Sequence, residues 1–71
     1  MNTETIEKNY TYHAPNEEQA KQYNKIRSEA KRLCNVINKL CPEGREKDQA
    51  LLKLEEVVMW ANAAIARAET K

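Results

Sequence analysis

Apolar residues recur at alternating intervals of three and four positions through two long segments of the chain. The first series comprises Tyr23, Ile26, Ala30, Leu33, Ile37 and Leu40. The second comprises Lys47, Leu51, Leu54, Val58, Ala61, Ile65 and Ala68, in which the lysine is the polar exception. Residues at these intervals lie along one face of an α-helix. The pattern therefore predicts two amphipathic helices, over residues 16–41 and 45–68.

The residues around these segments predict how the helices begin and how they are connected. Asn16 is followed three residues later by Gln19, the spacing of a capping box at a helix start. Pro42 cannot continue a helix, so residues 42–44 are expected to form the turn. Such a short connection forces two long helices into an antiparallel hairpin. We therefore predict an all-α fold with one domain over residues 1–71. Residues 1–15 form its N-terminal arm, with a single helical turn around residues 5–8.

A second periodic stripe follows the second helix beside the first one. It consists of Ala50, Lys53, Val57, Trp60, Ala64 and Arg67. A helix with two such stripes needs two partners, and the sequence predicts no third long helix. We therefore expect Ala50, Val57, Trp60 and Ala64 to form an interface with another copy of the chain, in a homo-oligomer whose subunit count the stripes do not fix. In the alternative, Trp60 only covers the core of its own hairpin.

Composition narrows the classes of partner. The chain has 71 residues and 41% hydrophobic residues, so its core is small and marginal by itself. A formal net charge of +1 provides no strong field for a nucleic-acid polymer or an anionic membrane. No apolar run approaches the roughly 20 residues that span a bilayer, and the N-terminus does not resemble a signal peptide. We expect a cytoplasmic protein.

The sequence offers little for catalysis, a cofactor or a metal. It has a single histidine and neither a Ser-His-Asp set nor a glycine-rich phosphate loop. Glu55 and Glu56 are neighbours, so they point about 100° apart on a helix and are expected to be solvated. Cys34 and Cys41 are separated by about 10 Å of helical rise, too far for a mutual disulfide. A zinc site needs about four ligands, whereas the chain offers only the two cysteines and His13. We predict a protein that is not an enzyme and needs no cofactor or metal.

Polar residues beside the helical stripes are the candidates for ligand binding. Asn24, Arg27 and Lys31 border the predicted core at spacings of three and four, and such a strip can bind phosphate unless it is simply a solvated face. A more outward basic stripe of Lys21, Lys25, Arg32 and Lys39 is expected to be solvated.

The arm and the end of the second helix add further candidates. The arm contains Tyr10, Tyr12 and His13, aromatic and imidazole rings that either stack on nucleobases or pack on a neighbouring copy. Arg67 either interacts with the carbonyl end of its helix or contacts a ligand.

Four segments together resemble the phage anti-CBASS protein two family over residues 12–67. They are YHAP at 12–15, YNKIR at 23–27, CPEGREK at 41–47 and KLEEVVMWANAAIAR at 53–67. The resemblance implies a helical homohexamer that sequesters cyclic dinucleotides and cyclic trinucleotides in the infected bacterial cell without cleaving them. Binding of the ligands by mass action keeps the CBASS effector inactive. The family uses a pairwise interface for dinucleotides and a separate pocket for trinucleotides.

The resemblance also assigns roles to single residues. Tyr12, with His13 beside it, would stack on a base, Arg27 would meet a phosphate and Arg67 would serve the trinucleotide pocket. Gly44 departs from the serine expected there, which should weaken the start of the second helix, and Asp48 replaces a small hydroxyl residue. The segment Arg45 to Lys47 matches but is expected to make protomer contacts or caps. Two competing functions remain, a helical protein-binding module without a nucleotide ligand and a phosphodiesterase that cleaves the same signals.

Overall fold

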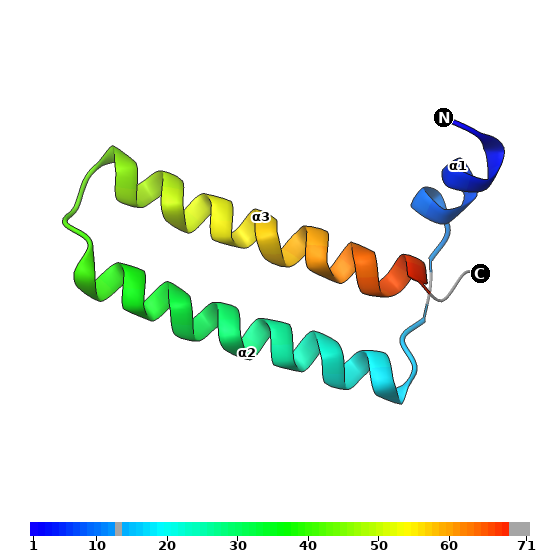
Figure 1. Cartoon of the computed structure of the whole chain (residues 1–71), viewed down its shortest axis with the longest axis horizontal. Helices are drawn as coiled ribbons and strands as arrows, with labels where there is room; N and C mark the ends of the chain where they lie inside the picture. Colours follow the sequence, from blue (N-terminus) through cyan, green and yellow to red (C-terminus); the bar gives the residue numbers. More distant parts are fainter. Residues whose placement is uncertain (13, 69–71) are drawn as a thin grey trace.

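The computed structural model describes residues 1–12 and 14–68, and within them it contains three α-helices and no strand. These are α1 (Thr3–Tyr10), α2 (Glu17–Leu40) and α3 (Arg45–Ala68). The two long helices run antiparallel and pack against each other, while α1 stands apart beyond the open end of the hairpin (Figure 1). The helical hairpin that the apolar periodicity predicts is therefore confirmed.

The helix in the N-terminal arm is longer than the single turn expected from the sequence. It begins after Asn2, whose side-chain Oδ1 accepts a hydrogen bond from the Thr5 backbone N–H at 2.8 Å. It ends at Tyr10, and the Thr11 N–H still donates to the Glu7 carbonyl. The segment buries no side chain, so no apolar stripe marks it in the sequence and only the asparagine cap does.

The start of α2 combines a local cap with a bond to the other helix. The Gln19 backbone N–H donates to Asn16 Oδ1 at 2.8 Å, and the Asn16 N–H donates to Gln19 Oε1 at 3.1 Å. This is the capping box that the sequence predicts. The Gln19 amide also donates to the Ile65 carbonyl at 3.0 Å, and Gln19 is only 3% exposed. One side chain thus fixes the entry of α2 and joins the helices at the open end.

A buried lysine joins the helices at the turn end. Lys47 is 7% exposed, its Nζ donates to the Asn38 carbonyl at 3.0 Å, and it forms an ion pair with Glu43. A buried ammonium is tolerated only when it is paired and hydrogen-bonded, as it is here. The contact also satisfies a carbonyl near the C-terminus of α2. Lys47 therefore acts as a helix cap within its own chain.

The backbone conformation of the turn explains why a glycine occupies position 44. Gly44 has a φ of +155°, a backbone region that residues with a Cβ rarely adopt. Its carbonyl accepts a hydrogen bond from the Asp48 N–H at 3.1 Å, so it occupies the cap position of α3. The expectation that glycine weakens this helix start compared with serine is therefore wrong for this turn, because a serine would be strained here.

The facing stripe of α2 differs from the heptad predicted from the sequence. Cys34 and Cys41 are half-buried without a disulfide, whereas Leu33 is 48% and Leu40 is 73% exposed. A straight α-helix drifts by about 20° per heptad relative to a strict 3.5-residue repeat. From Ile26 to Leu33 and Leu40 each heptad therefore turns the side chain farther from the facing edge, and Cys34 and Cys41 lie nearer to that edge than the leucines before them. On α3 the stripe from Leu51 to Ile65 is half-buried as predicted.

The chain is thin and elongated rather than compact. With α1 included, its extents are 45 × 29 × 13 Å, and its radius of gyration is 15.3 Å against about 11 Å for a compact chain of this length. The accessible surface is 6015 Å², about a third above the value of roughly 4,500 Å² that scaling predicts for the mass. Two helices therefore enclose little space between them.

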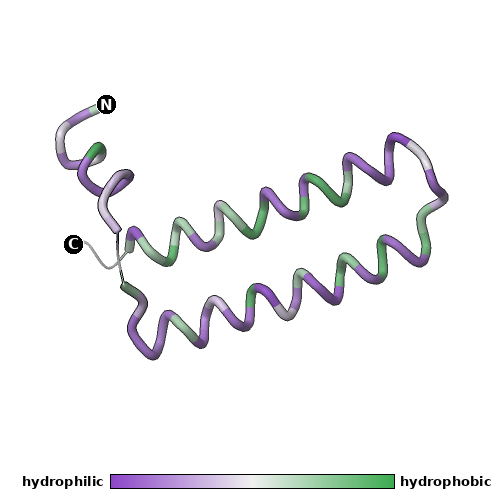
Figure 2. The backbone as a smooth tube through the Cα atoms, turned by 180° about the vertical axis from the view of Figure 1, so that it is seen from behind, coloured by the Kyte–Doolittle hydropathy of each residue, from purple (hydrophilic) through white to green (hydrophobic). Residues whose placement is uncertain are grey.

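Apolar surface remains uncovered on both long helices. No hydrophobic side chain in the described part of the chain is fully buried. Figure 2 shows apolar positions recurring along both long helices. The exposed large side chains of α3 are Leu52, Val57, Met59 and Trp60. A helix that is apolar on several sides normally lies inside an assembly or a larger core. No helix among the described residues is long and apolar enough to cross a membrane.

Candidate ligand-binding groove

A shallow groove crosses the middle of the hairpin where α2 and α3 pack. We call it the central groove; its volume is about 450 Å³. It is lined by Arg27, Ala30, Lys31, Cys34, Leu51, Leu54, Glu55 and Val58. Grooves of this size hold small organic ligands when a few polar groups surround an apolar floor. The central groove has that composition, because its five uncharged residues are half-buried and its three charged residues are exposed.

The spacing of residues along the two helices places the charged side chains at the edges of the apolar floor of the central groove. Arg27 and Lys31 are one turn apart on α2 and flank Ala30, which faces α3. Glu55 follows Leu54 on α3 and borders the same floor from the opposite helix. The antiparallel packing thus brings two cations and one carboxylate, from residues more than twenty positions apart, to the rim of one groove.

A charged side chain at the groove can bind a ligand only if neighbouring side chains do not already occupy its hydrogen-bonding groups. Arg27 Nη1 donates to Asn24 Oδ1 at 3.2 Å, which orients the guanidinium and leaves further N–H donors available. Lys31 and Glu55 have no side-chain hydrogen bond or ion pair within the part of the chain that is described. In the predicted strip, Arg27 is therefore bonded to Asn24, while Lys31 lies one turn farther along the same helix with its ammonium unpaired among the described residues.

The other predicted ligand residues lie outside this groove. Tyr12 is 83% exposed on the segment between α1 and α2, and Tyr10 is 85% exposed at the end of α1. His13 lies outside the described residues. Arg67 is half-buried in the last turn of α3, where its side chain already has an interaction partner. The structure brings Asn24, Arg27 and Lys31 together but does not bring Tyr12 or Arg67 to them within one chain.

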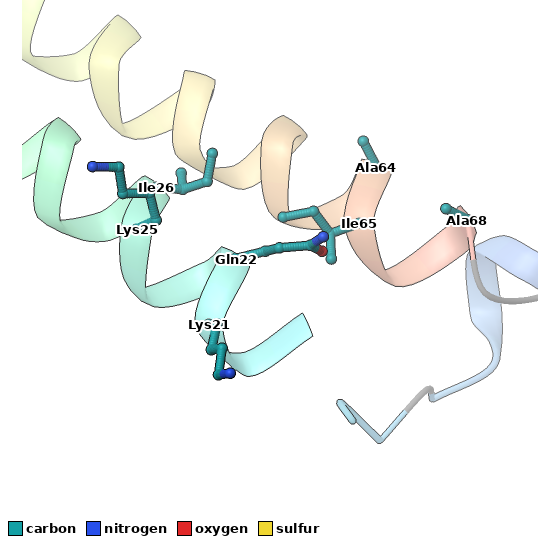
Figure 3. A pocket seen from close by; sticks show the side chains of 7 residues that line it. All are labelled: Lys21, Gln22, Lys25, Ile26, Ala64, Ile65 and Ala68. Atoms are coloured by element: carbon teal, nitrogen blue, oxygen red, sulfur yellow. The ribbon is translucent and has the colours of Figure 1, made fainter. Parts of the chain in front are cut away.

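A second groove at the open end is larger but less suited to an anion. It has a volume of about 600 Å³ and is lined by Lys21, Gln22, Lys25, Ile26, Ala64, Ile65 and Ala68. In Figure 3 the Gln22 side chain extends toward Ile65 while Lys21 points away from α3. Lys25 is already paired with Glu29 at 3.3 Å. The inner surface of this groove is therefore mainly apolar.

The outer basic stripe is partly neutralised by one glutamate. Glu29 pairs with Arg32 at 2.7 Å and with Lys25 at 3.3 Å, and all three side chains are exposed. The hydrogen bond from Arg32, followed by that from Lys25, lowers the pKa of the Glu29 carboxyl. The stripe behaves as the solvated face that its outward spacing predicts.

The predicted interface residues lie on a surface that the hairpin leaves open. Val57 is 59% and Trp60 is 65% exposed, so the alternative in which Trp60 covers the core of its own hairpin does not hold. Helical spacing places Val57, with Ala50 and Ala64, on the side of α3 away from Glu55. The same geometry places Leu33, Val36 and Leu40 on the side of α2 away from Arg27. We call these six residues the apolar face.

Two polar residues of α3 have environments that the spacing did not predict. Glu55 lines the central groove, whereas the adjacent Glu56 pairs with Lys53 at 3.6 Å, so the two neighbouring carboxylates are not equivalent. In the sequence, Glu55 differs from Glu56 only in that it directly follows Leu54, a residue of the facing stripe. Asn62 has a buried Oδ1 with no hydrogen-bond partner in the described residues. Nothing in its sequence neighbourhood marks that atom as unpaired.

Comparison with known proteins gives one result that covers nearly the whole chain. The family model described as Acb2/Tad1, hairpin domain, matches residues 2–66. No curated protein and no solved structure is significantly similar to the chain. The match includes α1, both helices of the hairpin except the last two residues of α3, and every residue of the central groove.

Proposed function

The chain belongs to the Acb2/Tad1 hairpin-domain family, which agrees with its resemblance to phage anti-CBASS protein two, and on this premise we propose that it sequesters cyclic oligonucleotides. The ligands are cyclic dinucleotides and cyclic trinucleotides that act as bacterial immune signals. The protein binds them intact in the cytoplasm of the infected cell and lowers their free concentration by mass action. The CBASS effector then stays inactive.

The observation that supports this proposal most strongly is the combination of charges and apolar floor in the central groove. Arg27 binds a phosphate through its planar fork, and Lys31 adds a point charge one turn away. Each hydrogen bond from a charged donor contributes about 1.5 to 3 kcal/mol. The half-buried side chains between the helices accommodate the flat face of a base. A compact ligand with phosphates and bases satisfies both parts.

The proposed binding sites are completed by a second copy of the chain. Tyr12 is exposed and does not line the central groove of its own chain, so it is free to stack on a base bound to a neighbour. Ala50, Val57, Trp60 and Ala64 supply the contact between copies, and the large accessible surface supports association. Six subunits are proposed from the resemblance. His13 would extend the stacking surface, and Arg67 would serve a separate trinucleotide pocket.

Binding without cleavage fits the groups available around the groove. A hydrolytic mechanism requires a positioned acid and base or a nucleophile beside the phosphate. The central groove provides two cations, one carboxylate and the half-buried thiol of Cys34, and its described lining contains no histidine, serine or threonine. These cations can hold a phosphate, but without a positioned acid and base they are not sufficient to cleave it.

A second function is favoured by one specific observation. Leu52, Met59 and Trp60 form an exposed apolar surface with the carboxylates Glu55 and Glu56 on the outer side of α3. Such a surface suits a partner helix with apolar and basic residues. In that case the protein would be a helical protein-binding module without a nucleotide ligand.

A calorimetric titration of the wild-type protein separates these two functions. We expect 3',3'-cyclic dinucleotides to bind with measurable heat and with an affinity that falls as salt concentration rises, because Arg27 and Lys31 pair with phosphates. Mononucleotides such as AMP serve as controls and should bind at least about tenfold more weakly, since they have one base and lack the second phosphate. Absence of heat with every cyclic di- and trinucleotide would favour the protein-binding module.

A further inference from the structure

We propose that Glu55 makes the central groove selective for cyclic nucleotides that contain guanine. The carboxylate would accept two hydrogen bonds from the guanine base, from N1–H and from the N2 amino group. This inference names the ligand class of the proposed sequestration site and therefore rests on that function. It concerns a residue to which the sequestration proposal gives no role, although Glu55 also borders the outer surface of the alternative protein-binding module.

The position of Glu55 separates it from an ordinary solvated glutamate. It lies on α3 at the rim of the central groove, across the apolar floor from Arg27 and Lys31. Its side chain has no ion pair or hydrogen bond with any described residue, although cations line the opposite rim. Glu56, the next residue, already pairs with Lys53. Glu55 also borders the outer surface of Leu52, Met59 and Trp60, so its unpaired carboxylate stands on the ridge between that surface and the central groove, within reach of a ligand in the groove.

The negative charge of Glu55 is unexpected in a groove that binds an anionic ligand. Placed near a phosphate it would repel the ligand and offset part of the attraction from Arg27 and Lys31. Placed near a base edge with hydrogen-bond donors it would bind. The two helices separate these roles, because the cations stand on α2 and the carboxylate on α3. A ligand that spans the groove can put a phosphate over α2 and a base edge over α3.

The donor pattern of the bases selects guanine. Its Watson–Crick edge presents two adjacent N–H donors, which match the two oxygens of an ionised carboxylate. The corresponding edge of adenine presents one donor and one acceptor, and the acceptor nitrogen faces a negative oxygen. A polar group set to pair with one ligand rejects an analogue that cannot complete the pair. Glu55 thus distinguishes the two purines, which have nearly the same size.

The test uses Glu55→Gln with Glu56→Gln as its matched control. Both changes remove one negative charge from an exposed position on α3, so helix content and thermal unfolding should stay the same. Each protein is titrated with cyclic di-GMP and cyclic di-AMP. We expect the wild type and Glu56→Gln to prefer cyclic di-GMP by about tenfold or more, because bonds to a charged acceptor are involved.

The glutamine variant should change the preference in a defined direction. A glutamine amide offers one acceptor and one donor, which match the Watson–Crick edge of adenine. Glu55→Gln should therefore lose about tenfold or more in affinity for cyclic di-GMP and gain affinity for cyclic di-AMP. Equal preferences in the wild type and Glu55→Gln would overturn the role of Glu55 and leave sequestration standing. Failure of the wild type to bind any cyclic nucleotide would remove sequestration and this inference together.

Discussion

Replacing Arg27 by alanine is expected to weaken the binding of cyclic dinucleotides by about tenfold to a hundredfold. In the proposed function the guanidinium makes a bidentate phosphate contact at the central groove, and the 3.2 Å hydrogen bond to Asn24 orients it. The change removes a charged donor for which Lys31 only partly compensates. Arg27 is exposed and on a long helix, so alanine should preserve the fold. Calorimetric titration of wild type and variant measures the difference.

Arg32→Ala provides the matched control for this variant. Arg32 lies on the same helix but pairs with Glu29 at 2.7 Å on the outer face, away from the central groove. Arg32→Ala removes the same positive charge and the same length of side chain as Arg27→Ala. We expect its affinity for cyclic dinucleotides to stay within about twofold of wild type. Equal affinities of Arg27→Ala and wild type would show that the central groove does not bind phosphate.

Replacing Val57 by glutamate should dissociate the oligomer and, with it, abolish high-affinity ligand binding. Val57 is 59% exposed on the apolar face, where the proposed assembly buries it against another copy. Burying an unpaired carboxylate at such a contact is unfavourable by several kcal/mol, so association should weaken by about a hundredfold or more. The single hairpin should also lose thermal stability, because its described residues include no fully buried hydrophobic side chain.

Sedimentation analysis at several concentrations measures this effect. Asn35→Glu introduces the same charge at an exposed position of α2 that belongs to neither the apolar face nor a groove. This control should keep the sedimentation coefficient of the wild type, whereas its new carboxylate lies one helical turn from Lys31 and should weaken ligand binding only modestly. If Val57→Glu sedimented like wild type and bound ligand normally, Val57 would not lie in the interface and the shared site would need different contacts.

The sequence was sufficient to predict the elements that depend on local rules. Apolar periodicity located both long helices, and the Asn16–Gln19 spacing located the start of α2. Lys47 stood out as a polar residue inside an apolar stripe, and the structure explains it through the Asn38 carbonyl and Glu43. These predictions succeed because caps and helical faces depend on residues within one or two turns of each other.

Features that depend on how two helices align were less predictable. The heptad pattern predicts Leu33 and Leu40 on the facing stripe. Cys34 and Cys41 lie closer to it, because the drift of a straight helix accumulates along its length. The sequence reveals the capping ability of the residue at position 44, whereas the positive φ of Gly44 is a property of the folded turn.

Sequence analysis predicts only the part of the candidate site that α2 contributes. Arg27 and Lys31 were selected by their spacing on one helix. Glu55 was missed as a groove residue, because its position opposite them follows from the register between α2 and α3 and not from its own helix. The parts assigned to Tyr12, His13 and Arg67 depend on a second copy of the chain and remain predictions.

Recovery of intact ligand tests sequestration most directly. The wild-type protein is incubated with a mixture of cyclic di- and trinucleotides, freed of unbound ligand by gel filtration, denatured by heat and analysed by chromatography. Sequestration predicts that cyclic nucleotides elute with the folded protein and reappear unaltered after denaturation. The appearance of linear nucleotides would show a phosphodiesterase, and protein that retains no nucleotide at all would contradict the proposed function.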